Sequence, residues 1–173
     1  AEWARRCAAT ARGTAHLWQG EAGFIVPRRY ALLPGWAQRP AHLGLSVRAS
    51  GGGLVPQGPG VWELSLLWPA PSVTPTHTGE IYRDLASQLA AALARLGIGD
   101  VAPGAVEGSW CDGRYNLAVG GAKIAGTAQA WKRVQGTPVA LVHAVIVVTA
   151  DPADLTARAN ACEEALGNPT RYR

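Results

Sequence analysis

The stretch from Gly108 to Gln129, GSWCDGRYNLAVGGAKIAGTAQ, is the most informative part of this sequence. Two strand-forming runs, Asn116 to Val119 and Ala122 to Ala125, are joined by Gly120-Gly121, a two-residue loop of the kind that permits positive φ. This pattern predicts a β-hairpin with Lys123 on its second strand. The residues that follow the lysine are small, so a ligand could approach the backbone beside it closely.

Working outward from this hairpin, alternating apolar residues predict five more strands. They are His16 to Trp18, Gly23 to Pro27, Leu43 to Ser50, Val61 to Trp68 and Val139 to Thr149. We expect the strand that ends at Ser50 to form a hairpin with the strand from Val61, and the Ser50 to Gly53 segment, SGGG, to be its glycine-rich corner.

Helix signals occur in three places. The opening segment AEWARRCAATARG has the composition of a helix end. Pro69, Pro71 and Pro75 mark a loop that ends at Thr78, a suitable N-cap for a second helix. Its apolar residues lie on one face and Gly97 ends it; they are Ile81, Leu85, Leu89, Leu93 and Leu96. A final helix is expected from Asp151-Pro152 toward Leu166. Strands outnumber helices and pair mainly as hairpins, which favours an α+β fold.

Composition indicates one compact domain. The chain has 173 residues, of which 48% are hydrophobic and 16% charged, with a formal net charge of +4. The basic residues are scattered rather than gathered into a run, which argues against nucleic acid as a partner. No apolar segment approaches the ~20 residues of a membrane span, so we expect a soluble protein without a membrane partner.

Three cysteines at wide spacing, Cys7, Cys111 and Cys162, form no CxxC pair, and no signal peptide opens the chain. Both features favour a reducing, cytoplasmic setting. No His or carboxylate spacing indicates a metal site. The sequence lacks methionine and opens within a helical pattern, so we expect residues 1–173 to be a single domain trimmed at an end.

Several residues are compatible with a functional role and also with a purely structural one. The SGGG corner can gather backbone N–H groups around an anion, or can be an ordinary bulged corner. Arg48 beside it can add a fixed charge or be solvated. Cys111 lies in a polar, turn-like setting that suits a nucleophile, although a lone cysteine is usually a small buried residue. His143 reads more readily as a satisfied strand histidine than as a general base.

Three separated motifs resemble the biotin/lipoate protein ligase and transferase family. They are SVRASGGGLVPQGPGVWELSL, GRYNLAVGGAKIAGTAQ and VHAVIVV, and the resemblance extends over roughly residues 14 to 155. It implies a mixed, largely antiparallel sheet flanked by helices, and an enzyme that attaches lipoate, octanoate or biotin to a lysine of a small, acidic lipoyl carrier domain.

The resemblance also implies residue roles. Lys123 takes the place of the family lysine that contacts the acyl carbonyl or acyl-phosphate. The residues implied to bind substrate are Arg48, Ser50, Gly51, Gly52, Gly53, Asn116, Gly126, Gln129 and His143.

Three branches of the family differ in mechanism. ATP-using ligases carry a second arginine and a His-Asp pair where this chain has Val47 and Gln57-Gly58. Octanoyl transferases carry a Pro-Cys-Gly turn, which the NACEEALG context of Cys162 lacks. The cysteine-dependent amidotransferases, with a cysteine shortly before the KxxG motif, are the most similar, and Cys111 occupies that place.

The sequence therefore predicts an acyl-enzyme on Cys111, stabilised by Lys123 and needing no cofactor. One alternative is an ATP- and magnesium-dependent ligase in which Lys123 binds the acyl-adenylate. Another is a non-catalytic module that binds the lipoyl or octanoyl group.

Overall fold

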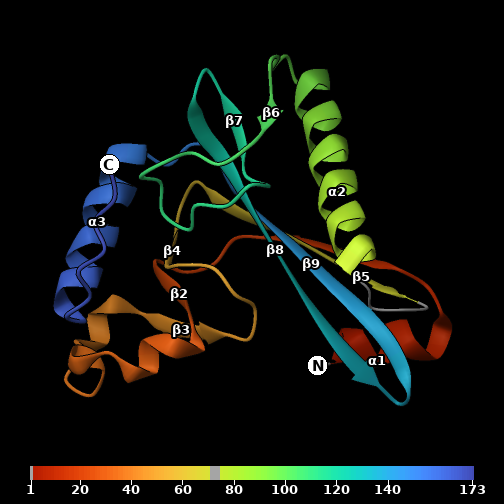
Figure 1. The fold of residues 1–173 in the computed structure, drawn as a ribbon, viewed down its shortest axis with the longest axis horizontal. Helices are drawn as coiled ribbons and strands as arrows, with labels where there is room; N and C mark the ends of the chain where they lie inside the picture. Colours follow the sequence, from red (N-terminus) through yellow and green to blue (C-terminus); the bar gives the residue numbers. More distant parts are fainter. Residues whose placement is uncertain (1, 71–74) are drawn as a thin grey trace.

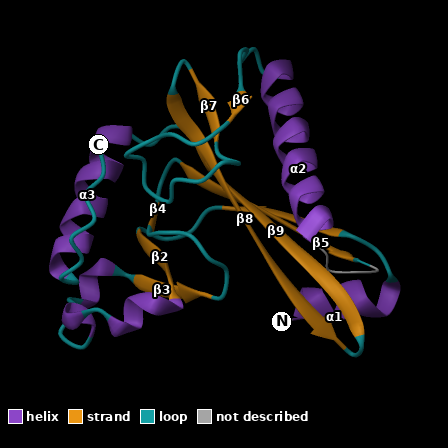
Figure 2. Ribbon diagram, in the orientation of Figure 1, coloured by secondary structure: helices purple, strands orange, loops and turns teal. Residues whose placement is uncertain are grey.

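The computed structural model describes residues 2–70 and 75–173, which form two β-sheets and three α-helices. Short 3-10 turns span Arg28–Leu32, Pro34–Trp36 and Ala41–Leu43. The elements, shown in Figures 1 and 2, are α1 (Glu2–Thr10), β1 (Thr14–Trp18), β2 (Gly23–Pro27), β3 (Leu45–Arg48), β4 (Val55–Gln57), β5 (Val61–Pro69), α2 (Pro75–Arg95), β6 (Ala102–Pro103), β7 (Leu117–Val119), β8 (Ala122–Val134), β9 (Thr137–Val147) and α3 (Pro152–Ala165).

The larger sheet has the strand order β1-β5-β9-β8-β7-β6 and is antiparallel throughout. The smaller sheet has the order β3-β2-β4, in which β2 pairs with β3 in parallel and with β4 in antiparallel. The predicted α+β class, with a mixed, largely antiparallel sheet system flanked by helices, is confirmed.

The two faces of the larger sheet are covered differently. The helix α2 lies along one face of the larger sheet (Figure 1). Its Leu85 and Leu89 pack there against Leu117, Val142 and Ala144. On the other face, α1 covers one end, where Cys7 contacts Leu67 and Val139. At the other end of that face, Trp110 and Leu155 join the small-sheet residue Val55 against Val61 and Val145. The helix α3 backs the small sheet.

Two local predictions are confirmed. The strands β7 and β8 form the expected hairpin, and both loop residues have positive φ, 56° for Gly120 and 82° for Gly121. The final helix begins after Asp151, whose side chain accepts a hydrogen bond of 2.9 Å from the N–H of Ala153. Gly167 follows it with a φ of 69°.

The predicted hairpin around the SGGG corner is wrong. Both edges of β5 are taken, one by β1 and the other by β9, so β5 has no edge left for β3. Instead β3 pairs with β2, and the glycine segment carries the chain across to β4 on the opposite edge of β2.

The second helix also differs from its prediction at both ends. It begins at Pro75 rather than after Thr78, which fits the preference of proline for the first helical turn. Pro69 ends β5, and Pro71 lies outside the described residues. At the other end the predicted apolar face is incomplete, because Leu96 is 77% exposed.

Candidate active site

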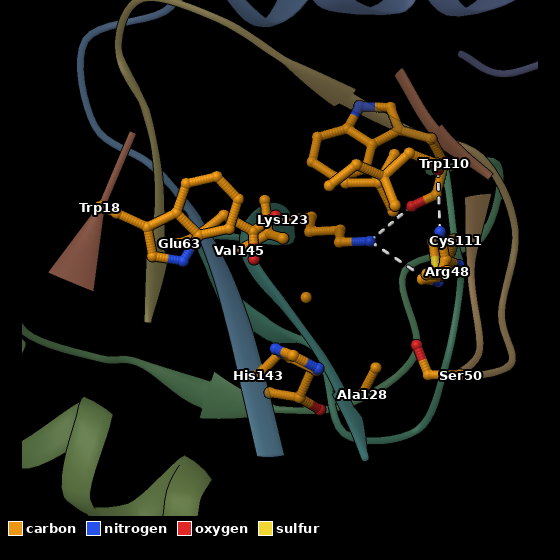
Figure 3. A pocket seen from close by; sticks show the side chains of 14 residues that line it. Trp18, Arg48, Ser50, Glu63, Trp110, Cys111, Lys123, Ala128, His143 and Val145 are labelled. Carbon is orange, nitrogen blue, oxygen red and sulfur yellow. Dashed lines mark hydrogen bonds between the residues drawn. The ribbon is translucent and has the colours of Figure 1, made fainter. Parts of the chain in front are cut away.

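A mostly apolar cavity of about 110 Å³ lies on the face of the larger sheet that α2 does not cover (Figure 3). It is lined by residues from both sheets and from the segment before β7. The lining residues are Trp18, Ile25, Arg48, Ser50, Val55, Glu63, Trp110, Cys111, Lys123, Gly126, Thr127, Ala128, His143 and Val145.

Strand pairing arranges the floor of this cavity in rows that cross β8, β9 and β5. Because adjacent strands are about 4.8 Å apart, a row over three strands spans about 10 Å. The first row is Gly126, Val145 and Glu63, and the second is Ala128, His143 and Ser65. Trp18 of β1 extends the first row beyond Glu63. The floor is therefore small and apolar over β8 and polar over β5.

A β-bulge turns Lys123 toward this floor. Leu117 pairs with Ala125 and Ala118 pairs with Lys123, so Ile124 is an extra residue on β8. Without it, strand alternation would place Lys123 on the same face as Ala125, which packs beneath α2. With it, Lys123 shares a face with Gly126 and Ala128.

Backbone carbonyls hold the Lys123 ammonium at the cavity. Nζ donates to the carbonyl oxygens of Trp110, at 2.5 Å, and Cys111, at 3.2 Å, and lies 4.5 Å from the centre of the Trp110 ring. Burial lowers the pKa of Lys123 to about 8, although nearby Cys111 and Asp112 act in the opposite direction. Gly126 leaves room for the ammonium, since a Cβ there would lie 3.3 Å from Nζ.

Cys111 lies across the cavity from the sheet floor and has an unusual backbone conformation. Its φ is 53°, in the left-handed region that non-glycine residues rarely adopt and that often marks functional positions. Its Sγ accepts a hydrogen bond of 3.3 Å from the N–H of Gly53, and Nη2 of Arg48 lies 4.0 Å away. The sulfur thus faces an N–H donor and a cation.

The glycine corner is shaped around this sulfur. Gly52 has a φ of 98°, and a Cβ on it would lie 2.6 Å from Sγ of Cys111. A Cβ on Gly53 would lie 3.3 Å from Cα of Cys111. Gly51 has open space around it.

Arg48 ties this corner to the small sheet. Its guanidinium donates to the carbonyl oxygens of Ile25 at 2.8 Å, Gly51 at 2.9 Å and Gly53 at 2.5 Å. Burial lowers its pKa, while the thiol of Cys111 and the carboxyl of Glu63 raise it. Ser50, buried beside it, lines the cavity.

His143 lies on a strand, where its ring has a hydrogen-bond partner, and it also lines the cavity. Its Nδ1 is 3.2 Å from Oγ of Ser65, which also accepts a hydrogen bond of 3.4 Å from Nε1 of Trp18. Burial lowers the pKa of His143, and the charge of Arg48 lowers it further.

Five of the residues implied to bind substrate do not line this cavity: the three glycines of the corner described above, Asn116 and Gln129. Asn116 is buried, with 2% of its surface exposed, and its Nδ2 donates to Oδ1 of Asp112 at 3.5 Å. Gln129 lies on the other face of β8, where its Nε2 donates to the carbonyl of Thr78 in α2 at 2.9 Å. The bulge reverses the alternation between Lys123 and Gln129, so their faces differ.

Glu63 was not among the predicted site residues. Its side chain is 4% exposed, lines the cavity and accepts a hydrogen bond of 2.9 Å from Nε2 of Gln57. Burial raises the pKa of Glu63 to about 7, despite the opposing effects of Gln57 and Arg48. The available signal was the spacing of Glu63 and Ser65, two polar residues on one face of an otherwise apolar strand.

A second, more open cavity adjoins the first at Cys111. Cys111 lines both cavities, and the second is also lined by Gly52, Gly53, Arg29 and Arg171. The other two cysteines lie elsewhere in the core and are fully buried. Burial raises the pKa of Cys162 to about 12, so its thiol is poorly suited to attack.

The sequence model of the lipoyl protein ligase A/B catalytic domain matches residues 9–167. The chain belongs to this family. The predicted membership of the biotin/lipoate ligase and transferase family, and with it the prediction of an enzyme, is confirmed. Within the part of the chain that the structure describes, we find no helix capable of crossing a membrane and no group of metal-binding side chains.

Curated relatives of this lipoyl protein ligase A/B domain include an uncharacterised protein of Cupriavidus necator, 41% identical over 95% of the chain and 72% of the relative. An octanoyl-GcvH:protein N-octanoyltransferase of Kyrpidia tusciae is 37% identical over 86% of the chain. The chain spans 54% of the length of that transferase.

Solved structures of similar fold include a lipoate-protein ligase A bound with ATP, with a TM-score of 0.67 and 20% identity over 91% of the chain and 63% of the ligase. A putative lipoate protein ligase of Thermoplasma acidophilum also has a TM-score of 0.67, at 20% identity, over 92% of the chain and 63% of that protein. These similarities establish the fold of the lipoyl ligase domain.

Proposed function

We propose that this chain transfers an octanoyl or lipoyl group to a lysine of a lipoyl carrier domain through an acyl-enzyme on Cys111. The observation that carries the proposal is the position of the thiol. Cys111 lies between the apolar cavity and the open second cavity, with an N–H donor and a guanidinium beside its sulfur. An acyl chain in the first cavity would leave its carbonyl at the sulfur, and the second cavity would admit the carrier lysine.

In the proposed reaction the Cys111 sulfur attacks the acyl carbonyl of the donor, and the donor's leaving group departs with a proton. The resulting thioester is attacked by the acceptor amine, which loses a proton as the amide forms and the thiol is restored. The Lys123 ammonium would stabilise the negative charge on the carbonyl oxygen in both steps. Its pKa of about 8 means that this charge is lost as the pH rises through 8.

The relatives support this branch of the family. Proteins of Kyrpidia tusciae and Geobacillus kaustophilus that match the chain at 37% and 39% identity are named octanoyl-GcvH:protein N-octanoyltransferases. These names describe transfer of an octanoyl group from octanoyl-GcvH to a protein. We accordingly propose lipoyl carrier domains as the partners, with Arg48, Ser50, Gly126 and His143 lining the acyl site.

Intact-mass measurement after incubation with an octanoyl thioester tests the acyl-enzyme. We expect the wild type to gain the mass of one octanoyl group and Cys111→Ala to gain none. Cys162→Ala is the matched control, because it removes another thiol and should keep the adduct. An undiminished adduct in Cys111→Ala would sink the mechanism. Binding of octanoate without any adduct or transfer would identify a non-catalytic binding module.

A pair of neighbouring glycines tests the geometry around the sulfur. Gly52→Ala places a Cβ against Sγ of Cys111 at a positive φ, whereas Gly51→Ala meets open space. We expect the rate of adduct formation to fall at least about tenfold in Gly52→Ala, as misplacement of about 1 Å can cost more than that. Gly51→Ala should react at the wild-type rate. Equal rates in the two variants would show that the corner does not position the thiol.

A second candidate is an ATP-dependent lipoate-protein ligase. The observation that favours it is the second cavity, where Arg29 and Arg171 lie near the glycine corner and suit the phosphates of a nucleotide. ATP would activate the acyl carboxylate as an adenylate. Carrier modification from free lipoate that requires ATP, and that survives Cys111→Ala, would establish the ligase in place of the transferase.

A further inference from the structure

The end of the cavity away from Cys111 is polar. Figure 3 shows Cys111, Arg48 and Ser50 on one side of the cavity, and Trp18 and Glu63 on the other. The floor connects the two sides through the row from Gly126 on β8 to Glu63 on β5, a span of about 10 Å. An acyl chain that lies along this row with its carbonyl at Cys111 would bring its far end to Glu63.

Glu63 has unused hydrogen-bonding capacity in this position. It is 4% exposed, and Gln57 donates to its Oε1 at 2.9 Å. Among the described residues, no hydrogen bond is found for its Oε2. This oxygen keeps accessible surface, because it is not among the fully buried polar atoms that lack a partner. An apolar chain end that covered it without a donor would therefore be disfavoured, whereas a ligand that supplies a donor would be favoured.

The neighbouring groups do not provide that donor. Ser65, on the same face of β5, is engaged with Trp18 and His143. The guanidinium of Arg48 acts on Glu63 through its charge, but its N–H groups are directed to backbone carbonyls of the small sheet and the glycine corner. Glu63 is therefore the polar group at this end that is left for a ligand.

We propose that Glu63 forms a polar subsite at the far end of the acyl cavity and selects a medium-length acyl group that carries a hydroxyl or N–H group at that end. The proposal rests on the proposed function, because it assumes an acyl chain in this cavity. Plain octanoyl would then be a poorer ligand than the same chain with a terminal donor.

Equilibrium binding of free acids to Cys111→Ala tests the subsite without requiring transfer. The probes are octanoic acid and 8-hydroxyoctanoic acid, which differ in one hydroxyl group. We expect the hydroxy acid to bind about tenfold more tightly, as a hydrogen bond to a charged or buried carboxyl allows. Adding Glu63→Leu should abolish or reverse this preference. Adding Glu63→Gln, which keeps an acceptor oxygen, should retain part of it.

Glu164→Gln is the matched control, since it removes an exposed carboxylate from α3 and should leave the preference unchanged. Thermal unfolding of each variant checks that it folds. Equal affinities for the two acids, tighter binding of octanoic acid, or a preference that survives Glu63→Leu would each overturn the subsite. So would a failure of both acids to bind. If the wild type still forms its octanoyl adduct, these outcomes leave the proposed transferase standing.

Discussion

Two buried glutamates in this protein have opposite surroundings. Glu163 on α3 is fully buried and accepts hydrogen bonds from Tyr30 at 2.6 Å, Tyr172 at 2.5 Å and Asn168 at 2.7 Å. Glu63 on β5 is nearly as buried, but among the described residues it receives one hydrogen bond, from Gln57. A carboxylate whose oxygens are satisfied by the protein is part of the structure, whereas one left incomplete beside a cavity is available to a ligand.

The cluster around Glu163 fastens the C-terminal residues to the active-site region. Tyr172 is held by its hydroxyl and also by its backbone, which exchanges hydrogen bonds of 2.8 and 3.0 Å with Asn160. The next residue, Arg173, donates from its N–H to the carbonyl of Gly108 at 3.0 Å. Gly108 begins the segment that leads into Cys111, so the cluster supports the position of the thiol.

The largest expected loss of stability comes from removing the Glu163 carboxylate, which accepts three hydrogen bonds. Glu163→Ala leaves the buried Tyr30 hydroxyl and the half-buried donors of Tyr172 and Asn168 without this acceptor, and should lower the free energy of unfolding by about 3–5 kcal/mol. Denaturant unfolding measures this. Glu164→Ala, at the exposed neighbouring position, should change stability by less than about 0.5 kcal/mol. A loss below about 1 kcal/mol in Glu163→Ala would break the distinction between the two glutamates.

The next effect should appear at Glu63 and depend on pH. Its pKa is raised from 4.5 to about 7 in the folded protein, so its stabilising contribution is present below pH 4.5 and is lost as the pH rises to 7. Between pH 5 and pH 8 the wild type should lose about 2 kcal/mol of stability through this group. Glu63→Gln should lack that loss and be the more stable protein at pH 8. Parallel pH profiles for the two proteins would contradict the raised pKa.

A smaller effect is expected from one donor to Glu163. Tyr172→Phe removes a hydroxyl that bonds to a buried carboxylate and should cost about 2 kcal/mol. A double-mutant cycle with Glu163→Gln should give a coupling energy of more than about 0.5 kcal/mol, because the two groups are in contact. Additive effects would mean that the short contact contributes nothing to stability.

The smallest change in stability should follow Gln57→Leu. The Oε1 atom of Gln57 is buried without a hydrogen-bond partner among the described residues, so losing the amide removes an unfavourable group as well as a favourable one. We expect a net change within about 1 kcal/mol. The pKa of Glu63, followed by carboxyl NMR titration, should nevertheless rise above about 7, because Gln57 lowers it. A fall in that pKa would show that Gln57 does not stabilise the ionised carboxyl.

Local signals predicted much of the fold. The Gly120-Gly121 turn and the proline and glycine that bound α3 act through nearby backbone conformation, and both elements formed as expected. The pairing of β3 was not predictable in this way. Whether β3 joins β5 or β2 depends on which strand edges remain after β9 has paired with β5, and that competition involves residues far apart in sequence.

Some residues of the candidate site were predictable from the sequence and others were not. Cys111 and Lys123 are close in sequence and stand out by residue type, and the structure brings them together. The spacing of Glu63 and Ser65 marks a polar face of β5, but the partners of β5 are needed to show that this face borders a cavity. Gln129 was implied by the resemblance. Regular alternation along β8 would place it on the same face as Lys123, and the extra residue between them breaks that alternation.

That extra residue, Ile124, has a consequence for anyone who transplants this site. Deleting it would leave every side chain near the lysine chemically unchanged yet would turn the ammonium away from the thiol and into the hydrophobic layer beneath the long helix. In a redesigned scaffold, a motif copied without the extra residue would keep the residue types of the active site. It would not place the lysine ammonium beside the thiol. The spacing is as much a part of the site as the amine.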